Sequence, residues 1–417
     1  MSAAMRGCPV STAVPDLTDP VLYSDGDPHL IFGRLRRQDP VSWTANGEGP
    51  GFWSVTKYRD ADIVLRDHSL FTSERGTLLN ILGTDDPAGG KQMAVTDPPK
   101  HTRLREPLQR ALSMKSVERH RETIRGTVVR LIEPLADGGV FDFAEAMVAM
   151  PMAVTGTLMG LPAADWPRLA DLTTAAIAPD DPEYTLPLGP QVTLETAHRE
   201  LFAYFQDVVH QRRKAPGDDL ISFLMGIEPD GRRMTPGEIM SNCYSLLLGA
   251  NVTTPHVASA AMATQTGTGV FEDWAAHPEL TIGGTEEALR WASPANHFMR
   301  YAVKDVVLAG REIAAGEAVV VWLGSANRDE EVFTEPFVFD IRRKPNRHIA
   351  FGIGPHYCVG HTVAKVTLRL LFGELLSRFE GFELVGEPER LRSNFVAGYK
   401  HLPIVARVRN LPGTVSY

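Results

Sequence analysis

The feature that most constrains this chain is a glycine-rich loop that delivers a cysteine to the start of a helix. The loop reads Phe351-Gly352-Ile353-Gly354-Pro355-His356-Tyr357-Cys358-Val359-Gly360. Its glycines permit left-handed or tightly packed backbone, so the main chain can fold closely around a flat group. After the cysteine, apolar residues recur at helical spacing from Val363 to Phe379, which predicts an amphipathic helix.

The position of Cys358 defines its possible chemistry. Unpaired backbone N–H groups and the positive end of a helix favour a thiolate there. Such a thiolate is either a nucleophile or an axial metal ligand, and a buried structural cysteine in a turn is the alternative. His356 could donate a hydrogen bond to an acidic group held by the loop. A zinc site is disfavoured, because the only three cysteines, Cys8, Cys243 and Cys358, form no paired spacing.

The pattern Phe-Gly-x-Gly-x-His-x-Cys-x-Gly resembles the haem-ligating loop of the cytochrome P-450 family, the haem-thiolate monooxygenases. The resemblance implies that Cys358 is the axial ligand of a b-type haem, iron protoporphyrin IX. It also assigns cofactor-binding roles in the loop to Phe351, Gly352, His356 and Gly360.

Composition and resemblance together predict the fold class, the kinds of partner and the cellular location of the protein. A chain of 417 residues with 43% hydrophobic residues can bury a large core. The resemblance implies a mainly α triangular-prism fold with minor β sheets, in which residues 15–417 form one catalytic domain after a flexible tail, residues 1–14. The net charge of −9 argues against nucleic acid as a partner. With no signal peptide, membrane-length apolar run or disulfide framework, we expect a cytoplasmic monomer that does not bind membranes.

Hydrophobic periodicity and turn residues predict the remaining elements. A glycine- and aspartate-rich stretch at 72–95 is long for a loop, and such loops are usually functional or mobile. In the family this region covers the substrate pocket, and a mobile lid lies where this chain has the proline-rich loop 179–190. We expect helices over 27–37, 58–66, 116–135, 144–159, 166–178 and 192–213, a hairpin over 41–55 and a second hairpin over 394–405.

A pair of basic residues follows a helix-start signal near residue 97. Asp97 precedes two prolines and is a plausible N-cap. His101 and Arg105 then project from one face of the helix, a spacing that also fits a basic surface patch. In the family, His-x-x-x-Arg in this place binds a haem propionate, and Arg300 matches the second propionate-binding arginine.

A long helix is predicted from the capping-box pattern of Thr235 and Glu238 to about residue 266. Its small residues Gly249 and Ala250 allow a flat partner to approach, and a buried, kinked helix would explain the same pattern. In the family's oxygen-activating helix, which also holds the cofactor, the small pair is followed by x-acid-Thr-Thr. This chain has Val252 in place of the acid. The candidate catalytic residues are Asn251, Thr253 and Thr254.

A Glu-x-x-Arg pattern at Glu287 and Arg290 matches a structural ion pair of the family, with Arg343 as its third member. The bare pattern is weak, since it also occurs at Glu118 and Arg121. A buried arginine needs carboxylate partners, so these residues are predicted to be architectural.

The resemblance implies insertion of one oxygen atom from O2 into a small, apolar organic substrate, a secondary metabolite, with electrons from an external ferredoxin and ferredoxin reductase. Three alternatives remain: an oxidative coupling or rearrangement on the same fold, which Val252 keeps open; a haem-thiolate sensor or electron-transfer protein; and a peroxide-using enzyme. His297 is as readily explained as a packing residue. By family position, the candidate substrate-lining residues are Leu246, Ala250, Ala295, Asn296, His297, Val396 and Ala397.

Overall fold

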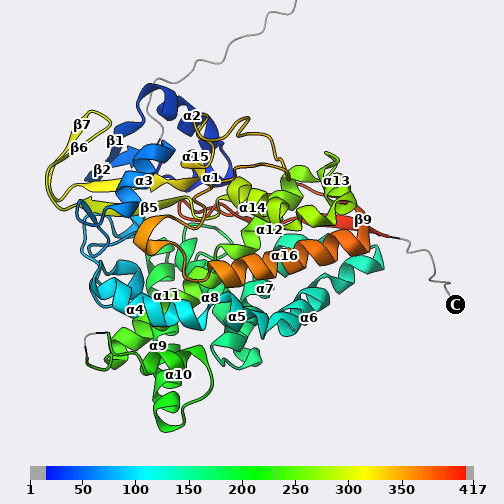
Figure 1. Ribbon diagram of the computed structural model, residues 1–417, viewed down its shortest axis with the longest axis horizontal. Coiled ribbons are helices and arrows are strands. Elements are labelled where there is room, and N and C mark those ends of the chain that lie inside the picture. The colour runs from blue at the N-terminus through cyan, green and yellow to red at the C-terminus, as the bar shows by residue number, and fades with distance from the viewer. Residues whose placement is uncertain (1–15, 230, 410–417) are drawn as a thin grey trace, which may run out of the picture.

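The largest sheet lies on one side of the molecule, the strand side, and helices fill the other side, while β9 (Phe379–Leu384), in a smaller sheet, lies apart at the right of Figure 1. The computed structural model describes residues 16–229 and 231–409. Its largest sheet has the strand order β1-β2-β8-β5-β3, with β2 and β8 parallel and the other neighbours antiparallel. These strands are β1 (Val41–Asn46), β2 (Gly49–Val55), β3 (Phe71–Thr72), β5 (His297–Ala302) and β8 (Ala318–Trp322).

The smaller sheets correct the predicted hairpin over 394–405. The chain in this region switches sheets at Leu402, so the two strands pair with other strands and not with each other. Strand β11 (Tyr399–His401) pairs with β10 (Glu389–Arg390), whereas β12 (Pro403–Val408) pairs with β9 (Phe379–Leu384) and β4 (Phe141–Asp142). Strands β6 (Val306–Leu308) and β7 (Arg311–Ile313) form a separate pair.

Helix α16, which follows the cysteine loop, crosses the middle of the molecule between the strand side and the helical side (Figure 1). Its apolar face belongs to one large core cluster, to which α6 (Arg121–Ile132), α13 (Val270–Ala276) and three further helices also contribute. The three further helices are α7 (Phe143–Leu158), α12 (Thr254–Gln265) and α14 (Thr281–Ala292), and α16 itself spans His361–Arg378.

The other helices cover the sheet and complete the helical side. None of the helices in the described ranges combines the length and apolar character needed to cross a bilayer. The remaining helices are α1 (Val21–Ser24), α2 (Pro28–Gln38), α3 (Tyr58–Arg66), α4 (Lys100–Ala111), α5 (Met114–Glu118), α8 (Trp166–Ile177), α9 (Pro190–Lys214), α10 (Leu220–Met225), α11 (Pro236–Asn251) and α15 (Leu323–Ala326).

Three of the predicted helix boundaries were wrong. The helix expected over 116–135 is divided into α5, α6 and a 3-10 turn, Glu133–Asp137. Asp97 is not an N-cap: α4 begins only at Lys100, and the Asp97 carboxylate instead accepts from Thr72 Oγ1 and, at 3.0 Å, from Ser73 N. The long helix over 235–266 is interrupted at Val252 and Thr253, which separate α11 from α12. The predicted capping box of Thr235 and Glu238 is confirmed.

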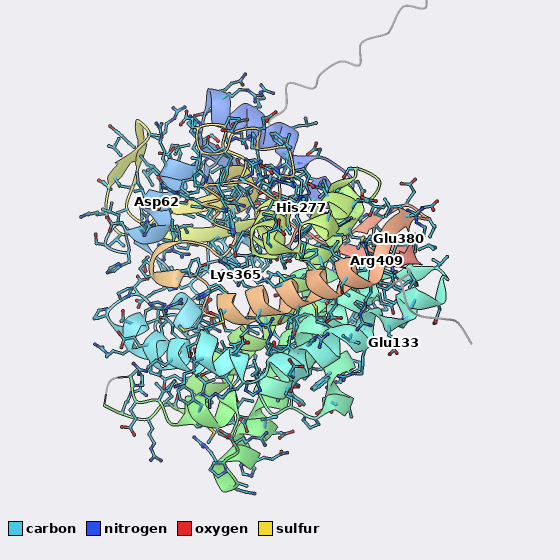
Figure 2. The ribbon with its side chains drawn as sticks, turned by 45° about the vertical axis from the view of Figure 1, so that its right-hand side comes forward. Asp62, Glu133, His277, Lys365, Glu380 and Arg409 are labelled. Carbon is cyan, nitrogen blue, oxygen red and sulfur yellow. The ribbon has the colours of Figure 1, made fainter. Side chains whose placement is uncertain are left out.

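Two carboxylates on α14 tie the cysteine loop to the rest of the fold. Glu286 binds Lys365 of α16 at 2.8 Å and His348, ahead of the loop, at 3.1 Å. Figure 2 labels Lys365 near the start of α16. Although burial opposes ionisation, hydrogen bonds from His348 and Lys365 lower the pKa of Glu286 to about 2. The carboxylate is therefore charged at neutral pH and holds the two segments together.

The neighbouring Glu287 is fully buried with Arg290. Arg290 donates to both carboxylate oxygens, at 2.8 and 2.7 Å, and Arg343 donates to the same two oxygens at 3.1 Å. Arg290 also donates to the carbonyls of Asn327, Pro336 and Val338. This group of contacts fixes the segment that leads from β8 to the cysteine loop.

We expect Glu287→Gln to lower the free energy of unfolding by about 3–5 kcal/mol, because it leaves Arg290 as a buried charge without its counter-ion. Glu118→Gln is the matched control, since Glu118 and Arg121 form the same i,i+3 pair at the surface, with side chains 51% and 46% exposed. An exposed pair contributes at most about 1 kcal/mol. Denaturant unfolding measures both variants, and equal losses would contradict a structural role for the buried pair.

Candidate functional site

The cysteine loop is built from backbone conformations that require glycine. Gly352 and Gly354 have φ angles of +70° and +77°. A Cβ on Gly354 would lie 2.7 Å from Leu65 O, so only glycine lets the loop pack against α3. The turn closes with a 2.8 Å hydrogen bond from Cys358 N to Phe351 O. These contacts position the Cys358 thiol in front of α16.

The environment of Cys358 does not by itself favour a thiolate, contrary to the sequence-based expectation. Burial raises the pKa of the thiol, whereas the Gly360 N–H and the positive charge of Arg105 act in the opposite direction without overcoming it. The helix-end argument neglected this desolvation. A metal ion would supply the missing driving force, because coordination deprotonates a thiol outright.

The four basic residues predicted to bind propionates lie together beside the loop. The rings of His101 and His356 are 4.2 Å apart, and Arg105 donates to the Tyr357 carbonyl. Arg300 approaches from β5 and is close enough to lower the pKa values of both histidines electrostatically. Burial, reinforced by Arg105, lowers the pKa of His101 to about 4. The segments that converge here are α4, β5 and the cysteine loop.

This cluster lacks anionic partners and fits the carboxylates of a haem. Arg300 is 4% exposed; the charge of Asp97 acts on it electrostatically, but no ion pair with a carboxylate is formed in the described ranges. His101 Nε2 is buried with no hydrogen-bond partner among the described residues. Burying an unpaired cation is costly, so an acidic group is expected between these side chains. His101, Arg105, Arg300 and His356 could hold two propionates, with Cys358 as the iron ligand.

Open space for a flat group lies along α11. Gly249 is exposed, and a Cβ placed on it would meet no atom within 4 Å. Leu246 and Ala250 also keep exposed surface on this part of the helix. Val359, next to Cys358, packs in the same apolar cluster as Leu246. The predicted distal helix and the cysteine loop are therefore brought together around this space.

The break between α11 and α12 gives the candidate catalytic residues different surroundings. Thr253 is half-buried, and its Oγ1 donates to Gly249 O at 3.2 Å. Thr254 begins α12 and is buried. Asn251 is also buried; its Nδ2 lies 3.3 Å from Met152 Sδ on α7, and its Oδ1 has no partner in the described residues. The amide of Asn251, one of the candidate catalytic residues, therefore points towards α7 and not into the open space.

Val252, at the position of the family's acid, is part of an apolar cluster. It is 4% exposed and packs with Ile177 and Ala178 at the end of α8 and with Leu391 and Val396 near the C-terminal strands. None of these side chains can donate or accept a proton, although the half-buried Tyr184, which carries a hydroxyl, also packs against the cluster. The structure thus replaces a polar contact at the helix break by apolar packing.

One face of β5 carries an aromatic side chain next to the basic cluster. Side chains alternate along a strand, so Phe298 shares the face of Arg300 and His297 lies on the opposite face. Phe298 is half-buried and its ring lies 6.2 Å from that of Phe395. Phe395 packs in one apolar cluster with Phe298 of β5 and in another with Val252. We call Phe298 and Phe395 the aromatic wall.

The aromatic wall corrects part of the predicted lining. His297 and Val396 are 0% exposed, so neither faces open space in this structure, while Ala295 and Asn296 are 5% exposed and Ala397 is half-buried. The sequence reasoning missed Phe298 and Phe395. The period-two alternation from Arg300 was a signal that could have identified Phe298.

Comparison with known proteins agrees with the fold and identifies the family. A family model described as Cytochrome P450 matches residues 283–400. Linalool 8-monooxygenase from Pseudomonas putida is 34% identical over 94% of this chain and 98% of that protein. The solved structure of P450 OxyD, described as involved in the biosynthesis of vancomycin-type antibiotics, has a TM-score of 0.84, 34% identity and coverage of 94% and 100% of the two chains. Mycobacterium marinum cytochrome P450 CYP268A2 in complex with pseudoionone has a TM-score of 0.86, 31% identity and coverage of 97% and 100%. The expected mainly α fold is confirmed, and the chain is an enzyme of the cytochrome P450 monooxygenase family.

Proposed function

We propose that this enzyme inserts one oxygen atom from O2 into a small, apolar organic substrate, with electrons from an external ferredoxin and its reductase. The observation that supports this most directly is the pairing of the Cys358 loop with open space at Gly249, beside basic residues that lack anionic partners. When bound, a b-type haem with a thiolate ligand supplies the activation of O2.

The residues around that space have separate roles in this proposal. Cys358 ligates the iron, while His101, Arg105, Arg300 and His356 bind the propionates. The aromatic wall, Leu246 and Ala250 exclude water and orient the substrate. Thr253 holds a proton at its Oγ1 close to the reacting atoms.

The substrate class follows from the apolar lining. Relatives are named for linalool or described with pseudoionone and with vancomycin-type antibiotics, which agrees with a secondary metabolite as the substrate. The apolar packing of Val252 favours a second candidate, an oxidative coupling or rearrangement that needs less proton delivery from the protein. Both reactions use the same site.

An optical titration of the ferric protein against a diverse compound panel tests the proposed substrate class. A ligand that displaces water from the iron shifts the Soret band, so hits should cluster among apolar organic compounds. The hits are then incubated with a ferredoxin pair, and mass spectrometry distinguishes a product with one added oxygen from a coupled or rearranged product. Shifts by charged, polar compounds alone, with no turnover of apolar hits, would contradict the proposal.

The basic cluster gives a prediction on haem retention. We expect Arg105→Ala combined with Arg300→Ala to release haem faster than either single change, because each charge-assisted bond contributes about 1.5–3 kcal/mol. Arg110→Ala, in the last turn of α4 and exposed, is the control. Transfer of haem to an excess of apomyoglobin measures the rate. A double variant that retains haem like the parent would show that these arginines do not bind it.

A further inference from the structure

The buried histidine His297 uses both ring nitrogens to join two segments far apart in the sequence. Its Nδ1 lies 3.2 Å from Asn394 O, and its Nε2 lies 3.2 Å from Leu79 N. A backbone N–H can only donate, so Nε2 is the acceptor and Nδ1 carries the proton. Burial lowers the pKa of His297 to about 4, so the ring is neutral at physiological pH. A neutral imidazole matches one donor and one acceptor at once.

The first segment joined by His297 is the loop over 73–96, which nearly coincides with the stretch 72–95 that was expected to cover the pocket. Strand β5 holds this loop at further points. Met299 N donates to Thr77 O at 2.8 Å, and Tyr301 Oη accepts from Gly83 N at 3.2 Å. His297 adds the contact at Leu79, at the start of a 3-10 turn, Leu79–Ile81.

The second segment carries half of the aromatic wall. The His297 ring meets Phe395 edge-on at 5.5 Å and 68°, and it meets Trp322 at 5.3 Å and 64°. Phe395 then contacts Phe298 at 6.2 Å and shares an apolar cluster with Val252. The backbone around Phe395 is also fixed to the start of β5, through Asn296 N to Phe395 O at 2.8 Å. A displacement of His297 would therefore alter the position of the Phe395 ring more than the position of the Phe395 backbone.

We propose that His297 is a positioning residue that locks the aromatic wall to the loop 73–96 and thereby sets the shape of the substrate space. It does so from behind the wall, since it has no exposed surface. The inference rests on the proposed function, because the wall matters only if substrate binds beside it. It predicts that His297 affects which ligands fit, and that it does not affect haem binding.

The test compares His297→Phe, His297→Gln and Met299→Leu as haem-loaded proteins. Phenylalanine keeps a ring but loses both hydrogen bonds, whereas glutamine can restore one donor and one acceptor. Met299 lies on the same face of β5, is 0% exposed and bonds the loop only through its backbone, so Met299→Leu is the matched control.

Two readouts are measured for each protein. The first is hydrogen–deuterium exchange at the Leu79 amide, which we expect to rise about three- to tenfold in His297→Phe. The second is the ratio of affinities for 4-phenylimidazole and imidazole, taken from their Soret shifts. The larger probe reaches the wall and the smaller one does not, so we expect this ratio to change about three- to tenfold, with partial rescue in His297→Gln. A general loss of stability would weaken both ligands alike.

An unchanged affinity ratio together with faster exchange at Leu79 would overturn the proposal, because His297 would then be a fold contact only. A ratio changed equally by Met299→Leu would overturn it as well. If His297→Phe does not fold, a changed ratio in His297→Gln supports the proposal and an unchanged one overturns it. Failure of the proposed function is separate: the parent would then form no oxygenated, coupled or rearranged product from the panel hits, while exchange at Leu79 and the affinity ratio would still report the His297 contact.

Discussion

Replacing Cys358 by alanine is expected to abolish oxygen insertion, and replacing it by histidine is expected to abolish insertion while retaining an iron ligand. The reason is that thiolate ligation supplies the electron density that favours O–O cleavage, and an imidazole supplies less. Product formed from a panel hit, with a ferredoxin pair and reduced nicotinamide, measures the loss.

Cys243→Ala is the control for this prediction. Cys243 lies in the apolar cluster of α11, and burial raises the pKa of its thiol to about 12, so it is an inert packing residue. We expect the control to keep its activity. Turnover in Cys358→Ala at the parental rate would refute the assignment of the ligand.

The second large effect concerns the delivery of protons to the reacting oxygen. Val252 lies among apolar side chains and Asn251 points to Met152, so Thr253 is the candidate hydroxyl that remains at the open space. A single hydroxyl gives the protein an incomplete relay. We expect a hydroxyl or amine on the substrate itself to complete it.

This hypothesis predicts that an analogue lacking the polar group binds but yields mostly hydrogen peroxide. Losing one contribution to proton transfer costs about a hundred- to ten-thousand-fold in the chemical step. Thr253→Ala should cause a loss of similar size with the true substrate, because it removes the hydroxyl of the protein. Product formed per reduced nicotinamide consumed is the measurement for both comparisons.

A matched control for Thr253 lies on α7. Thr157 Oγ1 donates to Ala153 O at 2.7 Å, which is the same i to i−4 bond in an exposed position. Thr157→Ala should leave the coupling ratio unchanged. Equal coupling for substrate and analogue in the parent protein would exclude substrate assistance and leave a relay borne by the protein.

The parts of the site that the sequence predicted are those set by local chemistry. The cysteine loop needs glycine at its left-handed positions, and the residues of the loop are contiguous. Glu287 and Arg290 are three residues apart on one helix, so their contact also follows from spacing. Family resemblance then added partners from distant segments, such as Arg343 and Arg300.

The parts that the sequence did not predict depend on tertiary packing. The direction of the Asn251 side chain depends on where α11 ends and on its contact with Met152 of α7. Neither can be read from the local sequence. Strand β12 pairs with β4, which is distant in sequence, and no local turn signal reveals that partner. The sequence left open whether His297 lines the substrate space or packs in the core, because a shift of one residue in strand register moves a side chain to the other face of β5. The raised pKa of Cys358 arises from burial, which the loop sequence does not show.

The most direct test of the central claim is the absorption spectrum of the reduced carbon monoxide complex of the purified parent protein. If Cys358 is the thiolate ligand of a haem, the Soret band is strongly shifted to the red relative to nitrogen-ligated haem. The band should persist in Cys243→Ala and disappear in Cys358→Ala. A Soret band at the position of nitrogen-ligated haem in the active parent protein, or an unchanged red-shifted band in Cys358→Ala, would contradict the account.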